Sequence, residues 1–325
     1  MKSIKYSLSC LILSSCLPAY GNNFLQYYGN ISLAAEHIEE DDDREQYADR
    51  DYLQNKASRI GIHGEKQLPD NKGIFYRLEY GVNIVDKKNK DTIFLRDIYV
   101  GLQNEYGKIK LGYSNTPFKL AQGKVDVFND ILDLSTLLPG DNVESMLAVE
   151  ATPVPGLKVN LSYLLNDNPD APRNLRKGFS TSIGYRLDAF SAALAYERAT
   201  NGQDLMRAAG NYQYNNWLLG FMYQKNRTNA YSEQQESGYL VSLKYHWDNM
   251  AVKFQAINSD FTQGTKSFYG ISGKDAKSFA LGLDYYFLDA ATLMLYAARG
   301  QSDSSQEESQ QDDINLLGLG MKVLF

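Results

Sequence analysis

The sequence is poor in cysteine, proline and histidine, and it contains no long apolar run. Of its 325 residues only 2 are Cys, 8 are Pro and 3 are His. No stretch reaches the ~18 consecutive apolar residues that a membrane-spanning helix needs. There is no G-x-S-x-G elbow and no H-E-x-x-H motif, and no pattern pairs His37, His63 or His246 with Ser and Asp. We therefore expect no enzymatic activity, no metal site and no cofactor.

The charge balance is acidic, with 39 Asp and Glu against 33 Lys and Arg. A net charge of −6 argues against a nucleic acid as partner. Aromatic residues, in contrast, are abundant, with 24 Tyr and 14 Phe. Tyrosine joins an apolar ring to a polar hydroxyl, so it suits the boundary between water and an apolar phase.

The first residues, MKSIKYSLSCLILSSCLPAYG, have the order of features of a secretory signal. Two lysines precede an apolar stretch, and the A-x-G triplet follows at Ala19 to Gly21. We expect 1–21 to be a cleaved signal peptide and 22–325 to form a single domain. The sequence LSSC, which ends at Cys16, leaves a lipoprotein signal as an alternative. Cleavage after Gly21 removes both cysteines and two lysines, so the net charge becomes −8 and no disulfide can form.

Beyond residue 21, apolar residues recur with a period of two. In GIFYRLEYGVNIVD (73–86), apolar side chains occupy alternate positions from Ile74 to Ile84, and the positions between include Arg77, Glu79 and Asn83. This period predicts β-strands with one apolar and one polar face. Each strand spans about ten residues, longer than the usual ~5–6 of soluble sheets and long enough to cross a bilayer at a tilt.

The breaks between the expected strands alternate between short and long. Tight turns are expected at 68–73, 105–107, 153–156, 187–189, 215–216, 247–249 and 288–290. Long polar segments are expected at 36–56, 86–91, 114–142, 166–177, 199–204, 226–236, 258–276 and 300–313. Short turns at one end and long loops at the other are typical of an outer-membrane barrel, here with about 16 strands. A soluble β-sandwich and a β-helix are the alternatives, but the polar face is too rich in Gly, Ser, Asn and charges to form a core.

The last ten residues, LLGLGMKVLF, fit the closing strand of such a barrel. The outward positions would carry Leu317, Leu319, Met321, Val323 and Phe325, and these side chains would face lipid. A closed ring leaves no unpaired strand edge in the bilayer, which is why a transmembrane antiparallel β-barrel is the expected fold.

Several segments resemble the Gram-negative trimeric general porins of the neisserial and burkholderial type. The resemblance lies in FLQYYGNISLAAE (24–36), SRIGIHGEKQL (58–68), LRDIYVGLQNEYGKIKLGYSNTPFK (95–119) and FSAALAYE (190–197), and it extends over 22–325. The terminal Phe325 resembles the signal that the outer-membrane assembly machinery reads. The resemblance implies an outer-membrane homotrimer, in contact with lipid and lipopolysaccharide, that passes small hydrophilic solutes and ions.

The same resemblance implies a charged constriction inside the barrel, because a 16-strand ring is too wide for wall side chains to fill. The third long segment, 114–142, would fold inward and carry Asp126, Asp130 and Asp133, with Lys119 and Lys124 as opposing charges. From the residues alone, a solvated surface loop with a short helix at 126–134 is an equal alternative.

Opposite this segment we expect a basic wall on neighbouring strands. Arg59, Arg77, Arg96 and Lys110 fall on positions that face the lumen. Arginines facing acids across a narrow opening would create a transverse field that sorts solutes by charge. The alternative is that lumen positions are simply polar, so that basic residues there have no special role.

Acidic residues dilute the basic wall. Glu79, Glu150 and Glu65 also fall on inward positions, and Glu150 stands where many relatives carry arginine. We therefore expect weak selectivity with a lean toward cations. The EEDDD run at 39–43 is expected in bulk water near lipopolysaccharide, with weak binding of divalent cations as an alternative.

The sequence thus predicts an outer-membrane porin for passive diffusion. The alternative function is an adhesin or structural barrel whose tyrosines and acids at 226–236 and 300–313 contact a host or cell surface. Trimer formation would use the first and last strands, since the second long segment, 86–91, is short.

Overall fold

The computed structural model describes most of the chain beyond the N-terminal segment. The described residues are 24–41, 49–85, 92–129, 131–132, 137–140, 143–165, 177–198, 204–227, 235–261, 275–303 and 311–325. The expected signal peptide, 1–21, lies outside them, as do Asp130 and Asp133. Within the described ranges, no helix is long and apolar enough to cross a membrane.

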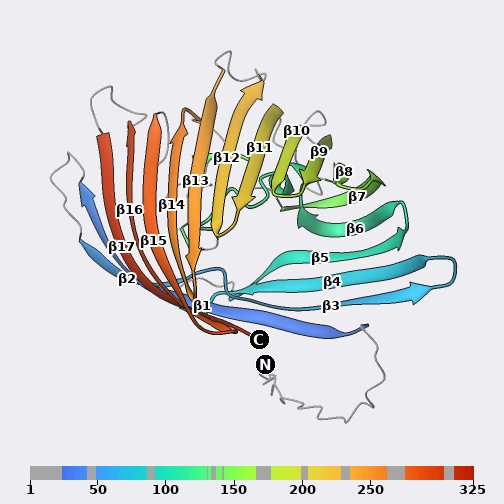
Figure 1. The fold of residues 1–325 in the computed structure, drawn as a ribbon, viewed down its shortest axis with the longest axis horizontal. Coiled ribbons are helices and arrows are strands. Elements are labelled where there is room, and N and C mark those ends of the chain that lie inside the picture. Colours follow the sequence, from blue (N-terminus) through green and yellow to red (C-terminus); the bar gives the residue numbers. More distant parts are fainter. Residues whose placement is uncertain are drawn as a thin grey trace, which may run out of the picture.

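The described chain is a ring of antiparallel strands (Figure 1). Their bounds are β1 Gln26–Asp41, β2 Arg50–Asn55, β3 Arg59–Leu68, β4 Lys72–Val82, β5 Ile93–Asn104, β6 Gly107–Asn115, β7 Val143–Val154, β8 Leu157–Leu165, β9 Lys177–Leu187, β10 Phe190–Arg198, β11 Asp204–Tyr214, β12 Trp217–Arg227, β13 Ser237–Trp247, β14 Met250–Ser259, β15 Ala276–Leu288, β16 Ala291–Asp303 and β17 Gln311–Leu324. From β3 to β17 each strand pairs with the next along the chain, β2 and β3 both pair with β1, and β17 pairs with β1 as well. The ring is therefore closed.

The second wall strand is interrupted, so β2 and β3 together fill one place in the ring. Both pair with β1, β2 alongside residues 33–38 and β3 alongside residues 26–30. The interruption falls at Lys56 to Ser58, where Ala57 has a φ of 55°. Counted in this way, the barrel has 16 strands, as expected from the sequence.

Closure uses the very last residue of the chain. The N–H of Phe325 donates to the carbonyl oxygen of Gly29 at 3.1 Å, and the N–H of Gly29 donates back to the carbonyl oxygen of Phe325 at 2.9 Å. A side chain at Gly29 would meet the Phe325 ring, because a Cβ there would lie 2.6 Å from Cζ. The glycine thus gives the terminal ring its place on the outer surface.

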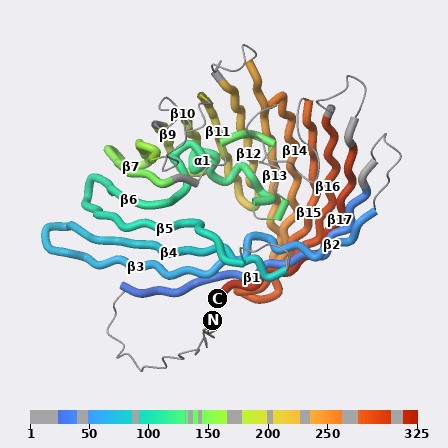
Figure 2. Tube along the Cα trace, turned by 180° about the vertical axis from the view of Figure 1, so that it is seen from behind, coloured from blue at the N-terminus to red at the C-terminus, as the bar shows by residue number. Residues whose placement is uncertain are grey.

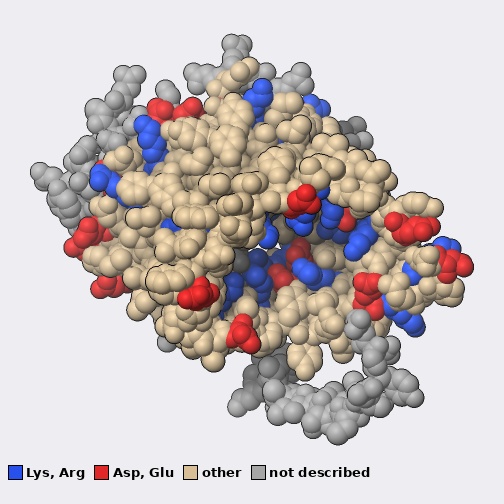
Figure 3. Space-filling model, viewed as in Figure 1, with Lys and Arg blue, Asp and Glu red and all other residues tan. Residues whose placement is uncertain are grey.

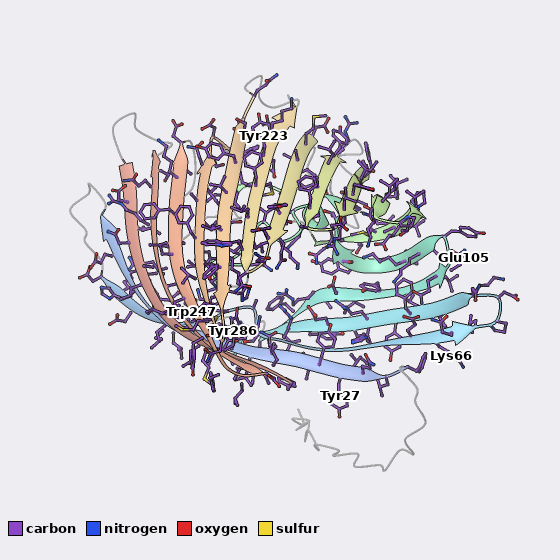
Figure 4. The ribbon with its side chains drawn as sticks, viewed as in Figure 1. Tyr27, Lys66, Glu105, Tyr223, Trp247 and Tyr286 are labelled. Carbon is purple, nitrogen blue, oxygen red and sulfur yellow. The ribbon has the colours of Figure 1, made fainter. Side chains whose placement is uncertain are left out.

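The two faces of the wall differ as the alternation predicts. On β17, Leu317 is 55% exposed and Leu319 is 60% exposed, whereas Leu316, directly before them in the chain, is 3% exposed. Tyr27 and Tyr223 project away from the ring (Figure 4). An apolar outer surface around a closed ring is stable in lipid, because a closed ring has no strand edge with a row of unpaired backbone groups.

All seven expected tight turns are present and lie at one end of the barrel. They join consecutive strands from β3–β4 to β15–β16. The turn residues Asp70, Asn71, Asp188, Asn215 and Asp248 have positive φ between 47° and 61°. Asp and Asn tolerate this conformation because their short side chains can hydrogen-bond to the local backbone.

The long segments at the other end are shorter than predicted. The expected loop 36–56 is wrong at both ends, because β1 continues to Asp41 and β2 begins at Arg50. Strand β16 likewise reaches Asp303, and β17 begins at Gln311. Strand pairing continues beyond the apolar band, where both faces carry polar residues and the two-residue period disappears. The segment 86–91 lies outside the described residues.

Candidate functional site: the lumen and its walls

The segment that follows β6 lies against the inner faces of several strands. We call its described residues, 116–129, 131–132 and 137–140, the 116–140 segment. It begins with α1, Pro117–Leu120, which is capped by Thr116 and lies across the ring in Figure 2. The short helix expected at 126–134 is not found in the described part, where residues 127–129 form a turn. Proline at the first helical position favours a start at 117 instead.

Inward-facing polar side chains bind the backbone of this segment at intervals. Ser180 on β9 accepts from the N–H of Phe118 at 2.9 Å, and Gln255 on β14 accepts from the N–H of Val127 at 2.9 Å. Ser259, also on β14, donates to the carbonyl oxygen of Leu137 at 2.6 Å. These side chains take the place of water for backbone groups that packing against the wall has buried.

Apolar residues of the segment complete an inner core with the wall. From the segment this core takes Phe118, Val125, Phe128, Leu132, Leu137 and Leu138. From the wall it takes, among others, Leu205, Met222, Leu240, Ile257, Ile314 and Leu316. Burial of each large side chain contributes roughly 1.5–3 kcal/mol, so the cluster holds the segment firmly against this part of the wall. The lumen is therefore filled beside β11–β17.

Arg207 on β11 binds both ends of the 116–140 segment. Its guanidinium donates to the carbonyl oxygens of Phe118 at 3.1 Å and Pro139 at 3.4 Å, and also to Gln224. The side chain is 4% exposed. A buried guanidinium supplies several charge-assisted hydrogen bonds in a fixed plane, which makes it a strong clamp.

The wall opposite the core, on β3 to β7, carries charged side chains of both signs. Figure 3 shows a hollow in the face of the molecule that is turned to the viewer, with basic and acidic side chains inside the hollow. Arg96 Nε donates to Glu79 Oε1 at 2.9 Å, and Arg77 lies 3.6 Å from Asp97. Lys110 lies over the ring of Tyr99, with Nζ 4.7 Å from the ring centre.

The expected lumen residues lie on inward positions of this wall, and two of the acids, Glu79 and Glu150, have basic partners. Glu79 also accepts from the Tyr28 hydroxyl at 2.6 Å. Glu150 on β7 lies 3.2 Å from Lys158 on β8. Arg59 on β3 lies opposite Asn30 in the ladder. The structure therefore brings Arg77, Arg96 and Glu79 together, whereas Glu65 binds Gln67 and Gln103 nearer the tight turns.

Asp97 is a lumen acid that sequence reasoning missed. The pairing of β4 with β5 shifts register between Glu79 and Tyr80, where a bulge adds one residue to β5. A bulge places two consecutive side chains on one face, so both Arg96 and Asp97 face inward. Strict alternation would have placed the carboxylate of Asp97 in lipid, which is unfavourable. This conflict was the signal in the sequence that the alternation breaks near Asp97.

Asp126 is buried in the 116–140 segment. Its side chain is 8% exposed, and Oδ1 accepts from the N–H of Phe128 at 3.0 Å. In the same part of the chain Lys124 is exposed. The other two acids expected at the constriction, Asp130 and Asp133, fall outside the described residues.

A buried ion pair on the core side of the lumen was also missed. Lys253 Nζ on β14 lies 2.8 Å from Asp284 Oδ1 on β15, with side chains 2% and 8% exposed. The ring of Phe128 covers Lys253, with Nζ 4.7 Å from the ring centre. Lys244 extends the group through the hydroxyl of Tyr286 at 3.2 Å. Only the placement of the 116–140 segment buries these charges, so period-two reasoning could not single them out.

The closed ring, with apolar residues outside and charged residues within, belongs to the class of outer-membrane β-barrels with a polar lumen. A family model described as Gram-negative porin matches residues 8–306, and the chain belongs to this family. It is therefore a channel protein of the outer membrane. This confirms the predicted fold class, the location and the general function.

Solved structures with the same fold have low sequence identity. A structure of Salmonella typhi OmpF in complex with daunomycin shares 18% identity, with a TM-score of 0.69 over 94% of this chain and 98% of that chain. OmpT of Vibrio cholerae shares 13%, with a TM-score of 0.66 over 93% and 97%. A triple mutant of Rhodopseudomonas blastica porin shares 14%, with a TM-score of 0.66 over 93% and 100%. At these identities the likeness concerns the fold alone. A search of curated proteins found no match.

Proposed function

We propose that small hydrophilic solutes and ions diffuse passively through an opening between the 116–140 segment and the charged wall of β3–β7. One observation carries this proposal: the inner core occupies the β11–β17 side of the lumen, while the β3–β7 side presents charged and polar groups. A packed apolar layer excludes water, and a charged wall requires it. The water path therefore runs along the charged wall, and the segment sets its width.

The pairing of charges supports weak ion selectivity. Arg96 with Glu79, Arg77 with Asp97 and Lys158 with Glu150 form three opposite pairs within 4 Å. Paired charges give a strong local field across short distances and a small net potential, so ions of both signs pass. The lean toward cations, expected from the acids in this wall and from the net charge of the chain, stays a prediction.

The assembly is proposed to be a homotrimer that packs through outer faces near the closure of the ring. Leu25 and Ile31 on the β1 side and Leu319 on β17 are exposed apolar residues on this surface. Either lipid or a second copy can cover such a face. Phe325 is proposed as the contact that the assembly machinery reads, and lipopolysaccharide as the neighbour of the long-loop end. Migration of heated and unheated samples on mild gels distinguishes a trimer from a monomer.

Conductance of the purified protein in planar bilayers tests the channel itself. Stepwise openings in KCl, together with swelling of liposomes in small sugars, are the expected results. A barrel that inserts but neither conducts nor leaks sugar would contradict the proposal. The adhesin alternative gains no support. Most of its segments 226–236 and 300–313 lies outside the described residues, namely 228–234 and 304–310.

A further inference from the structure

Phe94 on β5 is a large apolar side chain exposed on the inner face of the charged wall. It pairs with Gly81 of β4, and it is 42% exposed. The far edge of its ring occupies the place that a Cβ of Gly81 would take. Gly81 continues the inward row of Arg77 and Glu79, so the ring lies on the lumen side of the wall. Among the described inner-face residues of β3–β6, no other large apolar side chain is as exposed.

Two other inward rings of this wall lie on a glycine of the next strand and beneath a cation. In the order glycine, ring and cation, these sets are Gly61–Tyr28–Arg77 and Gly101–Phe75–Lys108. The guanidinium carbon of Arg77 lies 5.6 Å from the centre of its ring, and Nζ of Lys108 lies 5.4 Å from the centre of its ring. The face of an aromatic ring attracts a cation, so the wall itself covers these two rings.

Phe94 has the glycine but not the cover. Within the described ranges, neither a cation nor a second ring contacts it. Gly81 lies beneath one face of the ring, because glycine alone lets the backbone approach so closely. The other face is a flat apolar surface in the water-filled part of the lumen. A second ring stacks on such a surface in an offset arrangement.

The charges of the neighbouring wall disfavour a cation as the cover. On the inner faces of β3–β5 around this position there are three guanidiniums and two carboxylates, those of Arg59, Arg77, Arg96, Glu79 and Asp97. One positive charge is therefore in excess. It repels a cationic solute and favours a neutral or anionic one, although the ring face alone would attract a cation.

We propose that Phe94 is a stacking site for planar aromatic solutes that carry no positive charge. Phe94 is the second residue of β5, so a solute from the long-loop end meets it before the pair of Arg96 with Glu79. The inference rests on the proposed channel function, since the solute reaches the ring through the lumen. A stacked molecule stands in the water path along the charged wall, so binding is visible as a partial block of ion current.

Benzenesulfonate and cyclohexanesulfonate are matched probes, because they carry the same charge on rings of similar size and only the first ring is planar. In single channels in KCl, benzenesulfonate should reduce the current saturably, with a half-block concentration about fivefold lower than that of cyclohexanesulfonate. The saturated ring buries at least as much apolar area, so it would block equally well if the contact were only hydrophobic. Equal half-block concentrations, or a block that does not saturate, would overturn the proposal.

Two variants of Phe94 locate the block, each measured against its own open current. Phe94→Leu keeps an apolar side chain without the ring and should raise the benzenesulfonate half-block concentration about fivefold, while that of cyclohexanesulfonate changes less than about twofold. Phe94→Trp enlarges the ring and should leave the benzenesulfonate concentration equal or lower. Phe75→Leu is the matched control, because Lys108 already covers that ring, and it should change the concentration less than about twofold. Equal effects of Phe94→Leu and Phe75→Leu would disprove the site.

Tryptophan fluorescence of Phe94→Trp in detergent keeps this test separate from conduction. The unaltered chain has 2 Trp, Trp217 and Trp247, and its own signal provides the background. A saturable change with benzenesulfonate alone, absent from the unaltered protein, would support the site even if the protein carried no current, and the proposed channel would then fail alone. A protein that conducts in KCl but shows no such change would retain its proposed function and lose this inference.

Discussion

Arg207 and Phe118 form a stacked and hydrogen-bonded pair inside the barrel. The guanidinium carbon of Arg207 lies 4.2 Å from the centre of the Phe118 ring, and Nη1 donates to the carbonyl oxygen of the same residue at 3.1 Å. Because Arg207 also reaches Pro139, a single side chain of β11 connects the beginning of the 116–140 segment with its end. The segment is therefore attached at both ends to one point on the wall.

Replacement of Arg207 by Met should free the segment without unfolding the barrel. Loss of a charged donor costs about 1.5–3 kcal/mol for each hydrogen bond to it, and the strand ladder is unaffected. Trypsin, which cleaves after lysine, should then cut at Lys119 or Lys124 many times faster, and single-channel current should become noisier. Lys72→Met, at an exposed pair with Asp70, is the control and should change neither, since such pairs contribute about 0–1 kcal/mol. Unchanged cleavage in Arg207→Met would show that the clamp is unimportant.

Neutralising Glu79 should make the channel more selective for anions. Glu79 binds both Arg96 and Tyr28, so Glu79→Gln leaves the positive charge of Arg96 without its partner. The reversal potential under a KCl gradient should move toward that of chloride, by more at low salt than at high salt, because ions screen exposed charges.

Glu105→Gln is a suitable control for this experiment. Glu105 lies in the tight turn between β5 and β6, away from the paired charges (Figure 4). The same change of net charge at this position should shift the reversal potential much less. A shift of equal size in both variants would assign selectivity to the overall charge of the protein instead of to the wall of β3–β7.

The sequence predicted the ring but not the arrangement inside it. The turns at Asp70 and Asn215 and the outward row from Leu317 to Phe325 follow from local turn chemistry and from a strict period of two. Strand ends such as Arg50 were missed because pairing there continues among polar residues that show no alternation.

The inner charges depend on contacts between distant segments. Asp97 faces inward because of a bulge in β5. A strict period of two places this acid toward lipid, which signals a break in the alternation but does not fix the residue at which the bulge lies. Lys253 and Asp284 are buried because Phe128, far away in the sequence, packs over Lys253. Sequence reasoning identified residues on inward positions, but it could not tell which of them line water and which lie under the 116–140 segment.

The Lys253–Asp284 pair should stabilise the protein only as a pair. Lys253→Met leaves a buried carboxylate without its cation, which costs about 3–5 kcal/mol. Adding Asp284→Asn removes that charge and should recover much of the loss. The measurement is the temperature at which the folded barrel converts to the unfolded form on mild gels. If the double variant is as unstable as Lys253→Met, the loss comes from packing around Phe128 and not from the unpaired charge.

Gly282 on β15 provides the space in which Phe128 packs. A Cβ at this position would lie 2.7 Å from Cε1 of the Phe128 ring and 3.2 Å from Cε of Lys253, so Gly282→Ala must push the ring away from the wall. Overpacking of this kind costs about 1–3 kcal/mol, although alanine itself suits a strand better than glycine. Gly184→Ala is the matched control, since the nearest atom to a Cβ there is 3.6 Å away, and it should be neutral.

If its apolar core holds the segment, Gly282→Ala should accelerate trypsin cleavage at Lys124 and increase current noise, as Arg207→Met does, whereas Gly184→Ala should change neither. If cleavage stays slow in Gly282→Ala, Phe128 contributes little, and the hydrogen bonds from Arg207 and Gln255 hold the segment without it.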